Sequence, residues 1–599
     1  MKLVIVESPS KAKKIRELLG PGYRVAASMG HVRDLPPKGA LAVAFKDGKV
    51  LPTYEVLEKS SRAVSELSTL AKEAEIVLLA TDPDREGEAI AWHVSELLGK
   101  HPYKRVEFHA VTKAEVQKAV ASPREVDMRL VNAQQARRVL DRVVGWVVSP
   151  TLRRVGKEAK SAGRVQSVAL RLVAEREREI GKFNCVDYFI LQARLEKTGT
   201  PPPFTAKLVT WKGAPLSQRL TDAAVAEKTV EWCRKQQWKV LSCDRRDGLR
   251  NAPPPFTTAT VQQAASVRLK LNPDATMKLL QELFEDGRIT YHRTDSTALA
   301  PEAVEAARKI IAKDFPPEFL PKSPIVHATK AVNAQEAHEA IRPTHPESGP
   351  DALGAGDAGK LYRLIWQRFI ACQMAPGKDQ LTVIDVACAP DAWKTAKGEL
   401  VPMGVFQANG KVTLFDGWRR LTGEDATEET KTKKDHNKGE AEAEEDEEAS
   451  EELPLLQTGD PLEVRDLESA KRATKPPPRY TQASLIKKLE RAGIGRPSTY
   501  AAILRTILMR AYVEEKKRKL HATTLGLQVT EFLVRHYSGN FVDLNYTARL
   551  EEELDRISRG EADWEKVVTE ASFAVLALAK RAGLWGNPLD PPPPKPPAA

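Results

Sequence analysis

The chain is poor in cysteine and has no long apolar run. Five cysteines occur among 599 residues, and no two of them have the Cys-x-x-Cys spacing that is typical of zinc modules, so we expect no zinc. No run of eighteen apolar residues is present, which argues against a membrane-spanning helix. The amino terminus reads as a core strand rather than a cleavable leader. These features predict an intracellular, cytoplasmic protein without a membrane partner.

Acidic residues are unevenly distributed. Residues 423–452 hold fourteen acids and four lysines, yet the whole chain carries a net charge of +11, so the rest carries about +21. Such a basic body favours a polyanion partner, although ordinary solubility charge is the alternative. The acidic segment lacks apolar periodicity and is expected to be a disordered loop. A solvated insert is favoured over competition with DNA for a basic groove.

Three carboxylates alternate directly after the apolar run 76–80, which reads as a buried strand, and a helical pattern follows them. They are Asp82, Asp84 and Glu86. Open α/β sheets bind ligands at such strand ends, and adjacent hard oxygen ligands favour Mg²⁺. Two alternatives are a solvated acidic turn and an EF-hand loop, whose twelfth position would be His93 instead of the required Glu.

The first strand supplies another acid. Residues 3–6 read as a buried strand that ends at Glu7, with Lys11 shortly afterwards at the start of a helix. In a parallel sheet the two strand ends lie together, so we expect Glu7 beside Asp82 and Asp84. Lys11 would help to hold a phosphate near the helix start. A capping role is the alternative for Glu7.

Two groups of motifs now resemble known families. The acids resemble a TOPRIM domain, the metal module of type IA and type II topoisomerases and bacterial primases. The segment GRITYHRTDS at 287–296 resembles the active-site tyrosine segment of type IA DNA topoisomerases. The match runs in the family's order from residue 1 to about 575, and ESPSK at 7–11 points to the bacterial topoisomerase I branch. Three further segments agree: SAGRVQS at 161–167, AQEAHEAIRPT at 334–344 and GIGRPSTY at 493–500.

The resemblance implies a multidomain fold with α/β, α and β parts. A Rossmann-like TOPRIM domain, helical winged-helix-like domains and a β-rich arch are expected to form a toroidal core. Each winged-helix-like unit should end in a short β-like segment, at 288–291 and at 511–514. The expected parts are TOPRIM, 1–125; helical DNA-groove domain, 126–185 and 466–580; β-rich arch or hinge, 186–250 and 378–465, including the acidic loop; active-site tyrosine domain, 251–377; and a Pro-rich tail, 581–599.

The resemblance also implies an activity, the ATP-independent relaxation of negatively supercoiled DNA. Tyr291 would attack a phosphodiester in a single-stranded region, keep the 5′-phosphate and free a 3′-hydroxyl. Strand passage and Mg²⁺-dependent religation would follow without ATP. A tyrosine hydroxyl has a pKa of about 10 and is a weak nucleophile, so it needs nearby positive charge. Arg293 and Lys11 are the implied donors of that charge.

The resemblance assigns roles to three sets of residues. The catalytic set is Tyr291, Arg293, Glu7, Lys11, Asp295 and His338. The metal set is Glu7, Asp82, Asp84 and Glu86. The DNA-binding set is Arg137, Arg138, Asp141, Trp146, Arg164, Gln166, Arg496 and Thr499. Trp146 stands where the family usually has Tyr. His338 as a surface helix residue, Thr499 as a helix cap, and Glu7 as acid or as metal ligand are alternatives that stay open.

Other classes share some of these features. A TOPRIM primase needs the acids but no active tyrosine. A TOPRIM nuclease or recombination factor cuts DNA without a covalent link to the protein. A non-catalytic DNA-binding protein would use neither the carboxylates nor Tyr291. The closest alternative is a topoisomerase III-like decatenase. The expected protein is a bacterial, nucleoid-associated monomer.

Overall fold

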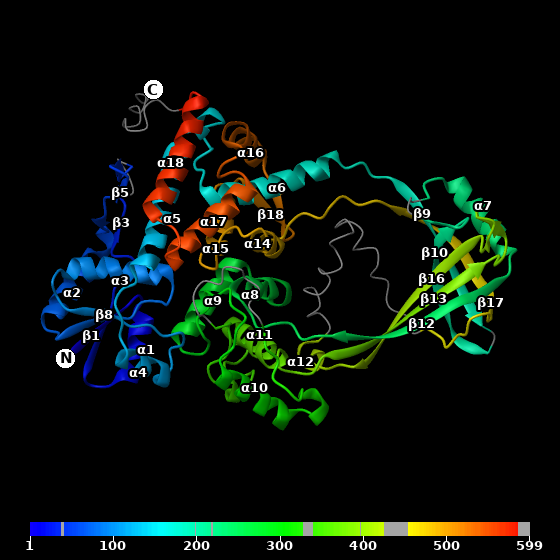
Figure 1. Cartoon of the computed structure of the whole chain (residues 1–599), viewed down its shortest axis with the longest axis horizontal. Coiled ribbons are helices and arrows are strands. Elements are labelled where there is room, and N and C mark those ends of the chain that lie inside the picture. Colours follow the sequence, from blue (N-terminus) through cyan, green and yellow to red (C-terminus); the bar gives the residue numbers. More distant parts are fainter. Residues whose placement is uncertain are drawn as a thin grey trace.

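The chain forms a broad body and a long β-rich arch, joined by two arms (Figure 1). The structure is a computed structural model that describes residues 1–36, 41–197, 199–216, 220–327, 339–395, 397–423 and 453–584. The predicted acidic loop, except Gly423, and most of the Pro-rich tail lie outside these ranges. Within them, no helix is both long and apolar enough to cross a membrane.

The first part of the body is a parallel sheet in the order β2-β1-β7-β8. The strands are β1 (Lys2–Val6), β2 (Tyr23–Ala27), β7 (Ile76–Leu79) and β8 (Tyr103–Arg105). Helices α1 (Pro9–Leu19) and α4 (Lys113–Ala121) cover one face, and α2 (Ser61–Lys72) and α3 (Arg85–Leu98) cover the other. Strands β1 and β7 are neighbours in register, with Val4 opposite Leu78. The expectation that Glu7 and the acidic turn share one sheet edge is therefore confirmed.

Short elements connect this sheet to the helices beyond it. They are β3 (Arg33–Asp34), β4 (Val43–Lys46), β5 (Lys49–Pro52), β6 (Glu55–Val56) and η1 (Glu58–Ser60).

The second part of the body is helical and is built from two distant stretches of sequence. The first contains α5 (Met128–Val148), η2 (Ser149–Arg154) and α6 (Arg164–Lys182). The second contains α14 (Gln482–Arg491), α15 (Tyr500–Met509), α16 (Thr524–Tyr537), α17 (Leu544–Arg559), α18 (Trp564–Arg581) and the hairpin of β18 (Val513–Lys516) and β19 (Lys519–Ala522). One apolar core runs through both stretches. The hairpin confirms the β-like segment expected near 511–514.

The third part of the body carries the tyrosine segment. It comprises α8 (Thr258–Ala264), the π-helical η3 (Ala265–Leu269), α9 (Pro273–Glu285), α10 (Pro301–Asp314), η4 (Pro317–Phe319), η5 (Pro346–Ser348), α11 (Asp357–Ala371) and α12 (Arg419–Thr422). The β-like segment expected at 288–291 forms no regular strand. Ile289 makes an isolated bridge to Pro343, flanked by backbone hydrogen bonds from Thr290 to Arg342 at 2.9 Å and from Thr344 to Arg288 at 3.0 Å, and this pairing is too short for a strand.

The arch is an antiparallel sheet in the order β11-β10-β16-β13-β12-β17-β9, and β10 also pairs with β9. The strands are β9 (Asp187–Lys197), β10 (Thr200–Trp211), β11 (Ala214–Pro215), β12 (Trp238–Arg250), β13 (Gly377–Cys388), β16 (Gly404–Phe415) and β17 (Pro461–Ala473). Helix α7 (Ala223–Arg234) and the pair β14 (Trp393–Lys394) and β15 (Leu400–Val401) complete it. Because strands from both sides of the tyrosine region share one sheet, the predicted single, interrupted β domain is confirmed.

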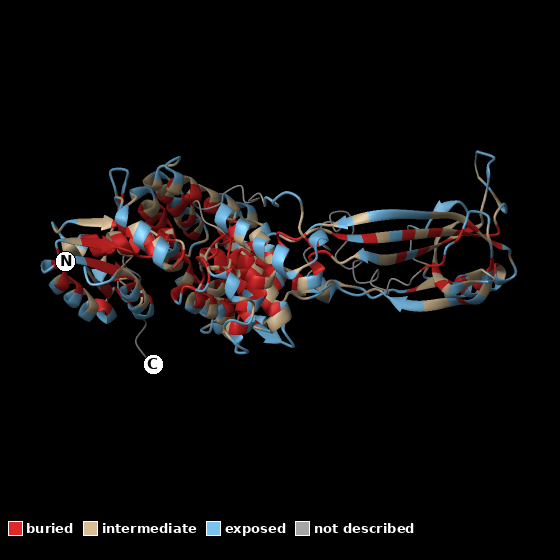
Figure 2. Cartoon of the chain, turned by 90° about the horizontal axis from the view of Figure 1, so that it is seen from below, coloured by how far each residue is buried: buried red, intermediate tan, exposed pale blue. Residues whose placement is uncertain are grey.

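The pattern of buried residues also distinguishes the body from the arch (Figure 2). Buried residues fill the body throughout, whereas in the arch they form narrow stripes along strands that are otherwise exposed. The expected multidomain fold is confirmed, while the exact domain boundaries stay a prediction.

Candidate active site

Tyr291 lies at the junction between the tyrosine region and the parallel sheet. Its side chain is 2% exposed and packs against the ring of Phe284, with the ring centroids 5.2 Å apart. The backbone N–H of Tyr291 donates to the carbonyl of His109 at 2.8 Å. Its hydroxyl donates to Oδ2 of Asp84 at 2.7 Å. The tyrosine and the acidic turn, more than two hundred residues apart in sequence, therefore form one site.

The acidic turn owes its shape to a helix cap and a glycine. Oδ1 of Asp84 accepts from the backbone N–H of Gly87 at 2.8 Å and so caps α3. A Cβ atom on Gly87 would lie 2.1 Å from the carbonyl oxygen of Asp82. The turn is therefore tight enough to require glycine, and it directs the second carboxylate oxygen of Asp84 towards Tyr291.

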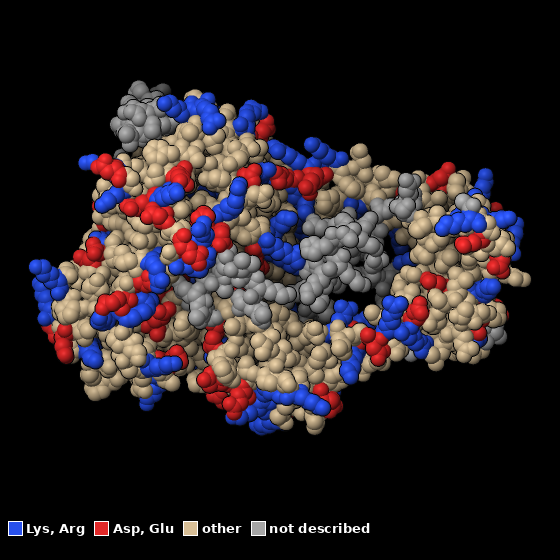
Figure 3. Space-filling view, in the orientation of Figure 1, with Lys and Arg blue, Asp and Glu red and all other residues tan. Residues whose placement is uncertain are grey.

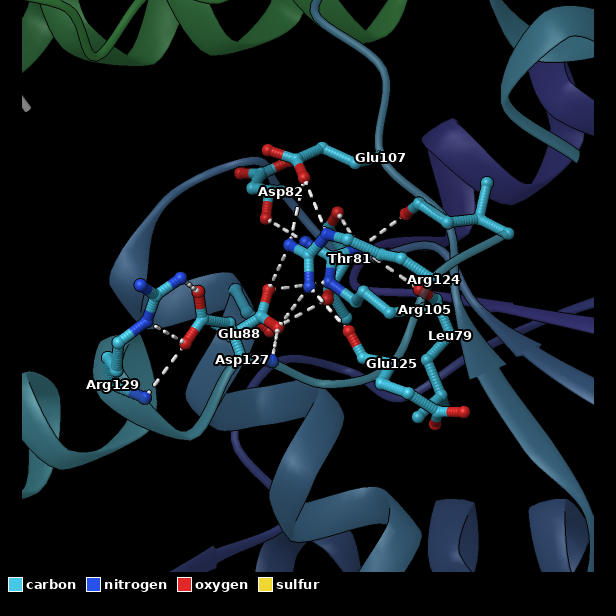
Figure 4. Close-up of polar contacts among 12 residues, drawn as sticks. Leu79, Thr81, Asp82, Glu88, Arg105, Glu107, Arg124, Glu125, Asp127 and Arg129 are labelled. Carbon is cyan, nitrogen blue, oxygen red and sulfur yellow. Dashed lines mark hydrogen bonds and ion pairs between the residues drawn. The ribbon is translucent and has the colours of Figure 1, made fainter. Parts of the chain in front are cut away.

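Arg105 supports this turn from below (Figure 4). The side chain is fully buried, and Nε donates to Glu88 at 2.8 Å. Its other nitrogens donate to the carbonyl oxygens of Thr81 at 3.0 Å and Asp82 at 2.6 Å. Sequence reasoning missed Arg105, since a single arginine at the end of a strand carries no recognisable signal.

The half-buried Glu7 and the buried Lys11 and Asp82 lie together beside the turn. Nζ of Lys11 donates to Oδ1 of Asp82 at 2.7 Å, and Oε1 of Glu7 accepts from the backbone N–H of Asp82 at 2.8 Å. Burial, and then the charge of Asp82, raise the pKa of Glu7 to about 8. Burial alone would raise the pKa of Asp82, but Lys11 and Arg293 lower it to about 2. At neutral pH this pair is one protonated and one ionised carboxyl.

The fourth acid of the expected metal set faces the helical region. Nε2 of Gln134 donates to Glu86 at 3.1 Å, and Nε2 of His31 lies 3.3 Å from the same carboxylate. Burial would raise the pKa of Glu86, but the contact with His31 lowers it to about 2.

The donor set fits a hard divalent cation only in part. Within the described ranges, no three His, Cys, Asp or Glu side chains converge closely enough to hold a metal ion. Lys11 neutralises Asp82, and Arg293 lies 3.5 Å from Asp84. However, Oδ2 of Asp82 is buried without a hydrogen-bond partner, and Glu7 is crowded by a second carboxylate. An additional cation would relieve both conditions.

The neighbours of Tyr291 set its protonation. Burial, followed by the charges of Asp84 and Asp82, raises the pKa of Tyr291 well above its ordinary value. Burial would lower the pKa of Arg293, but the charges of Tyr291 and Asp84 raise it. His292 is buried, and burial and then Arg293 lower its pKa to about 3, so the imidazole is neutral. Sequence reasoning did not single out His292.

Three of the expected DNA-binding arginines converge on α17. Nη2 of Arg137 donates to Glu551 at 2.6 Å, and Arg164 contacts the same carboxylate. Arg496 pairs with Asp555. Neither acid belongs to any motif recognised in the sequence.

Comparisons with known proteins agree with this geometry. A family model described as "Toprim domain" matches residues 2–111, and one described as "DNA topoisomerase" matches residues 125–569. The chain belongs to the type IA DNA topoisomerase family. It is 39% identical to DNA topoisomerase 1 of Campylobacter jejuni over 588 residues, which are 96% of this chain and 78% of that protein. Full-length topoisomerase I from Thermotoga maritima superimposes with a TM-score of 0.78 at 34% identity, over 96% of this chain and 90% of that one.

The relatives differ in length. DNA topoisomerase 1 of Zymomonas mobilis is 40% identical over 580 residues, which are 95% of this chain but 45% of that protein. The chain thus spans less than half of that relative. Since the type IA family is established, the readings as a primase, a nuclease and a non-catalytic DNA-binding protein are wrong. Both of these bacterial relatives favour the topoisomerase I branch over the topoisomerase III-like alternative.

The remaining residues that the type IA resemblance had singled out belong to the helical region, except Asp295, which follows Tyr291 in the tyrosine region, and His338. Arg138 makes a two-pronged contact with Asp34, at 2.7 and 2.8 Å. Thr499 stands at the start of α15, but its hydroxyl bonds to the backbone of Arg496 instead of capping that helix. Four others are half-buried or exposed, and His338 lies outside the described residues. These four are Asp141, Trp146, Gln166 and Asp295.

Proposed function

We propose that the chain relaxes negatively supercoiled DNA without ATP, by transient cleavage of one strand through a 5′-phosphotyrosyl intermediate. The observation that supports this most directly is the contact between the Tyr291 hydroxyl and Asp84 at 2.7 Å. A nucleophile in contact with the acidic turn can give its proton to a carboxylate of that turn and attack a phosphate bound there. A primase or a nuclease has no need of this contact.

In the cleavage step, Oη of Tyr291 attacks the phosphorus of a single-stranded phosphodiester. The bond between phosphorus and the 3′-oxygen breaks, and the 5′-phosphate stays on the tyrosine. The raised pKa of Tyr291 means that the phenol is protonated at rest. Asp84 already accepts the hydrogen bond from this phenol, so it is the nearest group to take the proton. Arg293 then stabilises the charge on the phosphate.

The departing 3′-oxygen needs a proton, and Glu7 is suited to give it. Its raised pKa keeps the carboxyl protonated near neutral pH. Lys11 supplies a buried positive charge next to the same edge of the sheet. Religation reverses these steps: the 3′-hydroxyl returns its proton to Glu7 and attacks the phosphorus, the bond between phosphorus and Tyr291 breaks, and Asp84 returns the proton to the tyrosine oxygen.

A Toprim domain implies a divalent metal, and Mg²⁺ is our proposal. Glu7, Asp82, Asp84 and Glu86 would hold it, and within the described residues Oδ2 of Asp82 is buried with no hydrogen-bond partner. When bound, the ion supplies positive charge that steadies the phosphate during religation. The Lys11 and Arg293 contacts of these acids must then loosen, which is consistent with metal binding that accompanies DNA binding.

Strand passage requires the tyrosine region to separate from the parallel sheet. The arch connects to the body through extended strands, and Lys and Arg side chains lie along the edges of the arms on the face shown in Figure 3. We propose that the arch is the hinge and that these basic edges meet DNA phosphates.

The test is ATP-free relaxation of a negatively supercoiled plasmid with Mg²⁺, together with detection of an SDS-stable protein–DNA adduct. Tyr291→Phe should abolish both. Tyr362→Phe is the matched control. Tyr362 is also a buried tyrosine of this region, but its hydroxyl donates to the carbonyl of His345 and not to the acidic turn. Tyr362→Phe should retain both activities. Relaxation or an adduct in Tyr291→Phe would overturn the proposal, as would wild-type protein that shows neither.

A further inference from the structure

The strongest unexplained feature is a buried cluster of opposite charges at the centre of the body. Four arginines from four separate segments surround two carboxylates of one helix. The arginines are Arg85 in α3, Arg137 in α5, Arg164 in α6 and Arg496 before α15, and the acids are Glu551 and Asp555 in α17. The acids lie one helical turn apart, so both project from the same face of α17.

Glu551 holds the arginines of α5 and α6. Arg137 donates to Oε2 at 2.6 Å, Arg164 contacts Oε1, and a nitrogen of Arg496 lies 3.8 Å from Oε2. The glutamate is completely buried. Burial would raise its pKa, but Arg137 and Arg164 hold that pKa well below the usual range.

Asp555 joins the acidic turn to the loop before α15. Arg85, which stands between Asp84 and Glu86 in the chain, donates to Oδ1 at 2.7 Å. Arg496 donates to Oδ2 through Nε at 3.2 Å and through a second nitrogen. Asp555 is 1% exposed. One carboxylate thus links the candidate metal turn to a DNA-binding candidate.

The donors of this cluster are not all satisfied. Four guanidinium groups meet Glu551 and Asp555, with Asp141 at the exposed rim 3.2 Å from Arg164, and the charge of Arg137 also lowers the pKa of Glu86. Nη1 of Arg85 and Nη2 of Arg164 are buried and have no hydrogen-bond partner within the described residues. A purely structural network would satisfy its donors, because unpaired buried polar groups are costly. Guanidinium groups with free donors instead suit a polyanion.

We propose that Glu551 and Asp555 are positioning residues that hold these arginines in the geometry that binds successive phosphates of the single strand. The proposal rests on the proposed function, since it assigns the free arginine donors to DNA. The acids do not contact DNA themselves. They act by keeping mutually repelling guanidinium groups together and aimed at one strand.

The positioning role and simple electrostatics predict opposite changes in DNA affinity when one of these carboxylates is removed. Removing a carboxylate makes the groove more positive, which alone would tighten DNA binding and steepen its salt dependence. If Glu551 positions the arginines, its removal lets them separate, and fewer phosphates are neutralised. Binding then weakens, and the salt dependence becomes shallower by about 0.7 in log–log slope for each phosphate of a single strand that the protein no longer neutralises.

The experiment compares Glu551→Gln and Asp555→Asn in the full chain, both in a Tyr291→Phe background to prevent adducts. Binding of a fluorescent single-stranded oligonucleotide is measured by anisotropy over a series of salt concentrations. Glu553→Gln is the matched control, because Glu553 lies on α17 but pairs with Arg556 at the surface. We expect binding about tenfold weaker or more for the two variants and unchanged for the control.

Each outcome has a separate meaning. Failure of the Tyr291→Phe parent to bind the oligonucleotide would contradict the proposed function. Tighter or equal binding by Glu551→Gln and Asp555→Asn, with a slope equal to or steeper than that of the parent, would overturn the positioning role alone. If Glu551→Gln does not fold, as judged by its thermal transition, Asp555→Asn decides the question, since Asn can keep one of the two arginine hydrogen bonds. Asp555→Glu, which keeps the charge, should recover part of the affinity.

Discussion

The body and the arch use charge in opposite ways. In the body, ionised side chains such as Lys11, Asp82 and Arg105 are almost fully buried where its parts meet. In the arch, the interior is apolar, and its ion pairs, such as Lys471 with Asp187, are on the surface. The buried pair of Asp379 and Arg419 lies at the root of the arm, where the arch joins the body.

Burying charge is unfavourable unless each group is paired and hydrogen-bonded, so it is retained where it does something that apolar packing cannot. In the proposed function, the parts of the body bind a polyanion and also separate from one another. The arch would then only have to connect and bend, for which alternating apolar residues suffice. The difference therefore indicates which region performs chemistry and which provides geometry.

The largest expected effect is loss of the buried arginine beneath the acidic turn. Arg105→Met removes the donors to Glu88 and to the turn carbonyls, and leaves Glu88 with the half-exposed Arg124 and the backbone N–H of Asp127. Breaking a buried pair costs about 3–5 kcal/mol. We expect a lower thermal transition and the loss of the SDS-stable adduct.

Arg129→Met is the control for that change, because Arg129 is exposed and pairs with Asp127 in the same view (Figure 4). It should leave both the transition and the adduct unchanged. An Arg105→Met protein that forms the adduct at the wild-type rate would show that the turn keeps its shape without this arginine.

The next effect should separate cleavage from strand passage. Phe406 is fully buried in the arch and packs against Trp238, with the ring centroids 4.7 Å apart. Phe406→Ala should cost about 3–5 kcal/mol locally. Relaxation should fall, while cleavage of a short oligonucleotide persists, because the arch does not touch Tyr291. Lys471→Gln, at the exposed pair, should change stability by less than about 1 kcal/mol. Equal loss of cleavage and relaxation in Phe406→Ala would contradict this division.

The sequence revealed the parts whose signal is local. Apolar runs before Glu7 and Asp82 located two parallel strands, and the period of two in the arch located its sheet. The carboxyl ends of neighbouring strands then had to meet, so the acidic edge was predictable. The glycine after the acids is explained by the tight turn, which a side chain would block.

The supports of the site were not predictable, for two physical reasons. Arg105 acts through backbone carbonyls, which leave no trace in the pattern of side chains. Glu551 and Asp555 belong to a helix whose alternating charges resemble a solvated surface helix. The partners of Glu551, Arg137 and Arg164, are about four hundred residues away in the chain. Only the packing of α17 against α5 and α6 shows that these acids face inward. At 288–291 the pairing with residues 342–344 stops after a single bridge, so no regular strand forms there.

The smallest expected effect tests whether buried charge makes the body sensitive to pH. The folded pKa of Glu7, about 8, is above the ordinary value of 4.5. Between these values the folded state keeps a proton that the unfolded state has lost, so stability falls as pH rises towards 8 and then levels off. Glu7→Gln removes this penalty.

Without Mg²⁺, the variant should therefore be more stable than wild type at pH 9, on the order of a few kcal/mol, and the difference should shrink towards pH 5. Thermal melts across this range give the measurement. Mg²⁺ should reduce the difference at high pH, because a cation stabilises the ionised carboxyl in the wild type only. The arch core holds no such acid, so Phe406→Ala should shift the transition equally at both pH values. A Glu7→Gln difference that does not vary with pH would show that this carboxyl is already ionised in the folded protein, and would remove it as the proton donor to the 3′-oxygen.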